Sequence, residues 1–399
     1  MKPSCLRCQR LGFQCDYSVR YIWKVAKPGS PAADRDITVS RGTKFVQSST
    51  PKAQPCICGA TERGEDVLRF FASSGHVLLH WSDAPANPLL DSLLSLSHKY
   101  PAIRDGIDAL MGTYHGYCSL GVLARFDSVI TGMKALVDPA MWASDPLAVL
   151  VASVLLTQIS MRAGYPWTGQ LAPILPLALA YREANADSVE TGFHYLELLG
   201  GLEMDAWIAA RQTKPLHIWS RYCMGRQGIE ASTALPRPLL DLISRVSRHE
   251  DVSHDLFGYA NGLAKRNDFQ ALHWRTYALT AILHLHGLII TQYDAKETTE
   301  QLLIVVRQLI EILETNRNHN IRILVWPIYV LAQNVLEEED MKFIAKFIRR
   351  ISETHGNARL LCEAIGQYSP RMSVLMSGIG RLTSLPADFS SSGVELGLW

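Results

Sequence analysis

Three cysteines near the start of the sequence have the spacing of metal ligands. Cys5, Cys8 and Cys15 form a C-x2-C-x6-C pattern. Two cysteines separated by two residues can direct both sulfurs at one ion, and a third thiolate supplies another corner of the tetrahedron that zinc prefers. The pattern therefore predicts a zinc site with these three residues as ligands. Three ordinary surface thiols are the alternative interpretation, because three thiolates leave the tetrahedron one ligand short.

The residues around these cysteines follow a more detailed pattern. Basic residues and a Gly-aromatic pair lie between the cysteines, and residues 4–17 read SCLRCQRLGFQCDY. This stretch resembles the second half of the DNA-binding domain of fungal zinc binuclear-cluster transcription factors. In that family, two copies of the motif supply six thiolates that share two zinc ions. The resemblance implies zinc as the cofactor and Cys5, Cys8 and Cys15 as three of its ligands.

Only the second copy of that motif has a counterpart here. The first copy carries the basic helix that reads base edges in the family, and it would precede Met1. Two explanations stay open: sequence upstream of Met1 encodes the first copy, or the protein has lost it. Small metal modules of this kind fold only with metal, so three of six cysteines predict weak zinc retention. Cys56 or Cys58 is a further, more distant source of a ligand.

The charge of the chain is concentrated in the same segment. The whole chain has a net charge of +1, whereas residues 1–30 hold six basic residues and one acidic residue. A basic arm of this kind favours contact with phosphate. The resemblance implies DNA-backbone contacts, which position a protein without reading sequence, for Arg7, Arg10, Arg20 and Lys24. For the residues beyond Cys15, an extended arm that packs its aromatic side chains on the body is the alternative.

Length and composition predict a large globular body behind this arm. The chain has 399 residues, of which 48% are hydrophobic and 19% charged, as in proteins with a sizeable core. We divide it into a partial zinc cluster with a basic arm (1–27), an irregular linker (28–63), a helical domain (64–385) and a tail (386–399). No signal peptide is visible, and the longest apolar run, Pro146–Met161, is too short to span a bilayer comfortably. We therefore expect no membrane association.

The elements that follow the linker are predicted to be helices. Apolar residues recur at helical spacing from residue 64, and no alternating strand pattern is found, so the fold class is all-α. Asn87 is the expected N-cap before Pro88, and prolines predict a short broken helix pair over 164–176. Gly200 and Gly201 indicate close packing. The other predicted helices lie at 89–100, 102–114, 120–137, 147–161, 193–210, 239–246, 268–293, 302–315, from 326, and 337–351.

This helical region resembles the regulatory domain that usually follows the binuclear cluster in fungal transcription factors. The resemblance rests on ANPLLDSLLSLSH at 86–98, ALPRPLLDL at 234–242, VWPIY at 325–329 and an acidic segment that leads into 343–351. It implies a nuclear regulator of RNA polymerase II genes whose body acts through partner proteins or a small effector. The implied partners are DNA, a second copy of the chain in a homodimer, and the transcription machinery or a co-regulator.

Two other classes of function are alternatives to a nuclear transcription regulator. The first is a helical protein-interaction or dimerisation module, derived from such a regulator, that no longer binds DNA specifically. The second is an enzyme, for which neither a nucleophile elbow nor a phosphate-binding glycine motif is present. We therefore predict that the chain is not an enzyme.

Overall fold

The computed structural model describes residues 68–69, 71–72, 88–114, 129–132, 144–163, 165–289, 291–315, 321–352, 361, 365 and 395–398. These residues belong to one of two units of the chain, Cys56–Trp399. The other unit, Met1–Pro55, contains the predicted zinc cluster and most of the predicted linker, and it lies outside the described residues.

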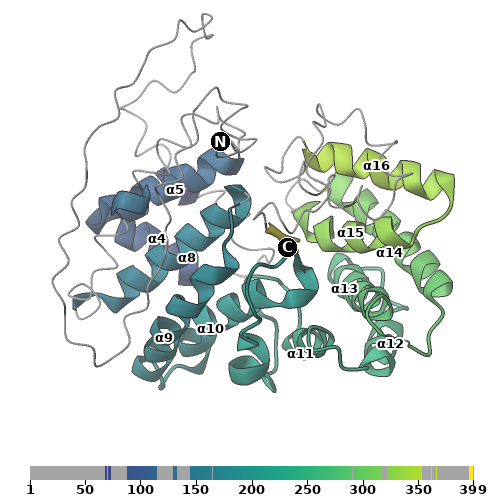
Figure 1. Cartoon of the computed structure of the whole chain (residues 1–399), viewed down its shortest axis with the longest axis horizontal. Coiled ribbons are helices and arrows are strands. Elements are labelled where there is room, and N and C mark those ends of the chain that lie inside the picture. Colours follow the sequence, from purple (N-terminus) through teal and green to yellow (C-terminus); the bar gives the residue numbers. More distant parts are fainter. Residues whose placement is uncertain are drawn as a thin grey trace, which may run out of the picture. The chain divides into compact units, whose positions relative to one another are not determined.

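The described part is almost entirely helical, which confirms the all-α class predicted for the body (Figure 1). Its α-helices are α4 (Pro88–Lys99), α5 (Pro101–Tyr114), α8 (Pro146–Ala163), α9 (Thr168–Ala184), α10 (Val189–Glu203), α11 (Arg237–Val246), α12 (Ser253–Gly262), α13 (Phe269–His286), α14 (Ala295–Thr315), α15 (Val325–Asn334) and α16 (Glu338–Ser352). Shorter helical turns are η1 (Asp205–Trp207), η2 (Trp219–Cys223) and η3 (Ile321–Leu324).

Several predicted helix starts are confirmed with their physical cause. Pro88 begins a helix as predicted, and the helix predicted from residue 102 begins one residue earlier, at Pro101. At the first position of a helix, a missing amide N–H breaks no intrahelical bond. The Asp268 side chain caps α13 by accepting a hydrogen bond from the Ala271 amide at 3.0 Å. The helix α15 begins just before Pro327. The predicted N-cap Asn87 lies outside the described residues.

The prediction of a broken helix pair over 164–176 is wrong. A continuous helix, α9, runs through both Pro173 and Pro176. Each proline removes one hydrogen bond to a carbonyl four residues earlier, in these cases the carbonyls of Gly169 and Ala172. Both of these residues are exposed, so water can satisfy the freed carbonyls while the opposite face of α9 packs in the core.

Two predicted helices are too long. The helix expected over 193–210 ends at Glu203, and η1 and the short strand β1 (Ile208–Ala209) follow. Strand β1 pairs antiparallel with β2 (Leu396–Gly397), and this distant partner is what keeps residues 208–209 extended. The helix expected over 268–293 ends at His286. Of the helix expected over 120–137, only residues 129–132 are described, and they are helical.

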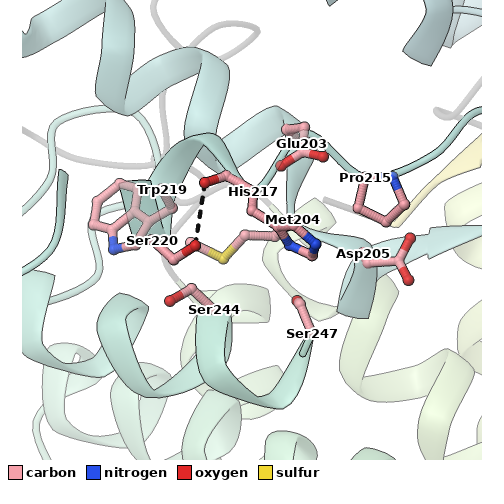
Figure 2. Close-up of a pocket in the computed structure, with 9 residues that line it drawn as sticks. All are labelled: Glu203, Met204, Asp205, Pro215, His217, Trp219, Ser220, Ser244 and Ser247. Atoms are coloured by element: carbon pink, nitrogen blue, oxygen red, sulfur yellow. Dashed lines mark hydrogen bonds between the residues drawn. The ribbon is translucent and has the colours of Figure 1, made fainter. Parts of the chain in front are cut away.

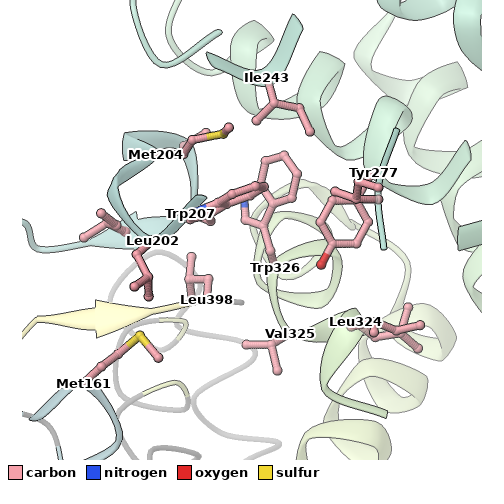
Figure 3. Packing of buried hydrophobic residues seen from close by; sticks show 14 of the residues in the cluster. Met161, Leu202, Met204, Trp207, Ile243, Tyr277, Leu324, Val325, Trp326 and Leu398 are labelled. Atoms are coloured by element: carbon pink, nitrogen blue, oxygen red, sulfur yellow. The ribbon is translucent and has the colours of Figure 1, made fainter. Parts of the chain in front are cut away.

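An aromatic cluster joins the two halves of the helical body. Trp207 is the last residue of η1, the short turn after α10, and its ring centroid is 5.6 Å from that of Trp326 at the start of α15. Tyr277 of α13 packs against both indoles, at 6.3 Å from Trp207 and 5.4 Å from Trp326. All three side chains are buried (Figure 3). Burial of such large rings makes this cluster a major source of stability.

Of the two glycines inside α10, Gly200 serves close packing, as predicted from the sequence, whereas a Cβ atom at Gly201 would make only an ordinary contact, 3.9 Å from the Thr233 methyl group. A Cβ atom added at Gly200 would lie only 3.1 Å from the main-chain N and Cα of Trp219 in η2. Any side chain at this position would therefore push η2 away from α10. The absence of a side chain allows the two backbones to touch.

Candidate functional site

The predicted zinc ligands and DNA contacts fall outside the part of the chain that the structure describes. These residues are Cys5, Cys8, Cys15, Arg7, Arg10, Arg20 and Lys24. Among the described residues, no group of three or more His, Cys, Asp or Glu side chains could hold a metal ion. Over the same residues, no helix has the length and apolar character that crossing a membrane requires.

The most specific polar arrangement in the described body surrounds Glu395. This side chain is fully buried, and both its oxygens accept hydrogen bonds at the N-terminus of α9. Oε2 accepts from the amides of Trp167 at 2.6 Å and Thr168 at 2.8 Å. Oε1 accepts from the Thr168 hydroxyl and, at 2.6 Å, from the Gln212 amide. Four donors therefore converge on one carboxylate.

The position of this carboxylate explains how α9 is capped. The first amides of a helix have no intrahelical acceptor and carry partial positive charge, so an anion is favoured there. No side chain next to α9 in sequence fills this role, because the N-cap residue Trp167 offers no side-chain acceptor. Glu395, more than two hundred residues away, supplies it instead.

The residues that follow Glu395 pair with strand β1. Leu396 and Gly397 pair with Ala209 and Ile208, and the Leu398 amide donates to the Trp207 carbonyl at 2.8 Å. Leu396 and Leu398 are buried. Figure 3 shows Leu398 beside the aromatic cluster at the end of the short strand. We refer to Glu395–Leu398 as the 395–398 segment. It combines one anchored carboxylate, main-chain pairing and two buried leucines.

A second buried polar cluster surrounds Glu197 of α10. Arg237 donates to its carboxylate through Nε at 2.6 Å and Nη2 at 3.0 Å, and the side chains are only 6% and 3% exposed. Arg226 also pairs with Glu197, and Arg237 reaches Glu190 at 2.7 Å. Burial raises the pKa of Glu197 above its ordinary value, and the hydrogen bonds from Arg237 oppose that shift. This cluster ties α10 to the start of α11.

Cys223, at the end of η2, lies near this cluster and has no reactive character. Its side chain is fully buried. Burial raises the pKa of the thiol, and the nearby charge of Glu197 raises it further. The thiolate is the reactive and metal-binding form. Cys223 therefore behaves as a small core residue.

A small pocket lies where α10, η2 and α11 meet (Figure 2). Its volume of about 10 Å³ is close to the space that one water molecule occupies. Sites for small organic ligands measure roughly 300–1,000 Å³. The pocket therefore has no room for a substrate or effector. Its lining residues are Glu203, Met204, Asp205, Pro215, His217, Trp219, Ser220, Ser244 and Ser247.

The serine hydroxyls and the Glu203 carboxylate that line this pocket already make hydrogen bonds within the protein. The hydroxyls of Ser220, Ser244 and Ser247 donate to main-chain carbonyls three or four residues earlier. The Glu203 carboxylate accepts from Arg211 at 2.7 Å and from the Ile218 amide at 3.1 Å. Among these nine residues, no serine hydroxyl is bonded to the His217 imidazole, which is the pairing that activates a serine nucleophile.

Two of the sequence motifs on which the regulatory-domain resemblance rests contribute residues to buried contacts in the body. Arg237, from the motif at 234–242, anchors the Glu197 cluster, and Trp326, from the motif at 325–329, lies in the aromatic cluster. Sequence reasoning missed Glu395 and Glu197. One signal for Glu395 was available: it is the single acid in the apolar run at 394–399. Its partner, the N-terminus of α9, has no signal in sequence.

No protein-family model, no curated protein and no solved structure matches this chain.

Proposed function

We propose that this chain is a nuclear, DNA-binding transcription regulator of the fungal zinc-cluster type that acts on RNA polymerase II genes. The observation that carries the proposal is the C-x2-C-x6-C spacing with interleaved arginines, followed by a body that is all-helical where it is described. The helical body supports the proposal because the resemblance implies an all-α regulatory domain behind the cluster.

The basic N-terminal segment has two roles in this proposal. Cys5, Cys8 and Cys15 contribute thiolates to zinc, which prefers tetrahedral sulfur ligands. The four basic residues in and after the cluster contact DNA phosphates and give affinity that depends strongly on salt. These four residues are Arg7, Arg10, Arg20 and Lys24.

The helical body acts through protein partners in this proposal. The resemblance leaves partner proteins and a small effector as alternatives. The pocket between α10, η2 and α11 holds about one water molecule, so it favours a protein partner over a small effector at that place. A homodimer and a co-regulator of transcription are the partners we propose.

Zinc content and salt-dependent DNA binding test the proposal on the 399-residue chain. We expect substoichiometric zinc that falls further in the Cys5→Ser, Cys8→Ser, Cys15→Ser variant. Binding to duplex DNA should weaken with salt at a log–log slope of about −3 to −4, because about four phosphates are contacted. Replacing the four basic residues by Ala should flatten that slope. Replacing Lys265, Lys296, Lys346 and Arg349 of the body is the matched control.

Two results would count against this function. Zinc content that does not change in the triple cysteine variant would remove the metal site. DNA binding that is absent at low salt, or unchanged without the four basic residues, would remove the DNA-binding role. If such a chain still dimerised in sedimentation experiments, the helical protein-interaction module that no longer binds DNA specifically would be the better description.

A further inference from the structure

We propose that the N-terminus of α9, the Gln212 amide and strand β1 form a peptide-docking site, which the 395–398 segment occupies in cis. The ligand class is an extended peptide with a glutamate followed by two leucines at alternate positions. The same site then accepts this peptide in trans when the cis segment is displaced. This inference does not depend on zinc or DNA binding.

The donors at the carboxylate end of the site belong to elements of the helical body. Thr168 is the first residue of α9 and Trp167 is its N-cap, and the Thr168 hydroxyl accepts a hydrogen bond from the Thr213 hydroxyl at 2.8 Å. The Gln212 amide follows Ala210, whose φ of 57° turns the chain after β1. Thr168 is itself buried. Donors that are preorganised in this way recognise a carboxylate with little loss of freedom on binding.

The remainder of the site recognises an extended backbone. Strand β1 offers its edge to Leu396 and Gly397, and Trp207 offers its carbonyl to the Leu398 amide. Addition of a strand to an exposed edge is a recurrent mode of peptide recognition, in which main-chain bonds give affinity and alternate side chains give specificity. Here the alternate side chains are Leu396 and Leu398, and both are buried.

The 395–398 segment contacts several elements of the helical body, which include α9, β1 and the neighbouring helix α8. Figure 1 shows the strand between helices α8–α10 and helices α13–α15. In this proposal the segment opens locally without unfolding the helices around it. Local opening is the step that lets another peptide enter.

Fluorescence anisotropy on the full chain tests this site. The probe is a labelled peptide of residues 391–399, SSGVELGLW. In the Glu395→Gln chain the cis carboxylate is replaced by an amide, whose NH2 faces amide donors, so the cis segment is a weaker competitor. We expect this chain to bind the probe at least tenfold more tightly than the wild-type chain. A probe with Gln in place of the glutamate should bind at least tenfold more weakly. Glu311→Gln, the same change at an exposed site on α14, is the control.

Two outcomes overturn the inference. One is a Glu395→Gln chain with a native circular dichroism spectrum that does not bind the probe, and the other is equal binding of the Glu and Gln probes. Hydrogen exchange on the wild-type chain keeps the test decisive if the variant does not fold. The amides of Trp167, Thr168, Gln212 and Leu398 should exchange together and faster than those in the middle of α13. Exchange of these amides only at the rate of global unfolding would refute an exchangeable segment.

Discussion

Removal of the guanidinium of Arg237 should destabilise the protein strongly, because it leaves a buried carboxylate without its main partner. Arg237→Met keeps much of the aliphatic stem and removes two hydrogen bonds to Glu197, one to Glu190 and one to the Gln227 carbonyl. Breaking a buried pair from one side costs about 3–5 kcal/mol. Arg226 still contacts Glu197, so we expect a loss near the lower end of that range.

The loss should also depend on pH. Burial raises the pKa of Glu197 in the folded protein, so the folded state binds its proton more readily than the unfolded state does. The contribution of this group to stability is then greatest at acid pH and declines as pH rises through the folded pKa. Removing Arg237 raises that pKa further. The deficit of Arg237→Met should therefore be largest at neutral pH and smaller at about pH 5.

Urea unfolding followed by circular dichroism at the two pH values measures both effects. Arg350→Met is the matched control, since Arg350 pairs with Glu314 at an exposed site, and its loss should stay below about 1 kcal/mol. In the double variant with Glu197→Gln, part of the stability should return, because no buried charge is left. A loss below about 1 kcal/mol for Arg237→Met, or the same loss at both pH values, would refute this reasoning.

Two further predictions concern packing and the titration of a partly buried histidine. Gly200→Ala should lower the free energy of unfolding by about 1–3 kcal/mol, because the added Cβ meets the Trp219 backbone. The control Gly258→Ala, on open helix surface, should not destabilise the protein. Urea unfolding of the two variants compares these effects. Burial lowers the pKa of His284 to about 4, so the free energy of unfolding of the wild-type protein should fall as pH drops from the ordinary histidine range toward that value. His284→Phe should remove this part of the pH dependence. The same dependence of stability on pH in the variant would contradict the prediction.

Sequence periodicity predicted most of the described helices, because the apolar face of a helix requires apolar residues at a regular local spacing. The starts at Pro88, Pro101 and Asp268 were also local, since a cap or a missing amide acts within one turn. The break expected at Pro173 and Pro176 did not occur. Whether a proline interrupts a helix depends on whether the freed carbonyls face water or core, and only packing decides that.

The candidate sites also differ in whether a local sequence pattern or the tertiary structure determines them. The cysteine spacing of Cys5, Cys8 and Cys15 and the charge beside it are local patterns, so the proposal of zinc and DNA binding comes from the sequence. The hydrogen bonds of Glu395 join residues 167, 168 and 212 to a segment more than one hundred and eighty residues further along the chain. No local pattern encodes the pairing of a carboxylate with the N-terminus of a distant helix. The tertiary structure alone decided it, because such a contact exists only after the helices have packed and brought both ends together.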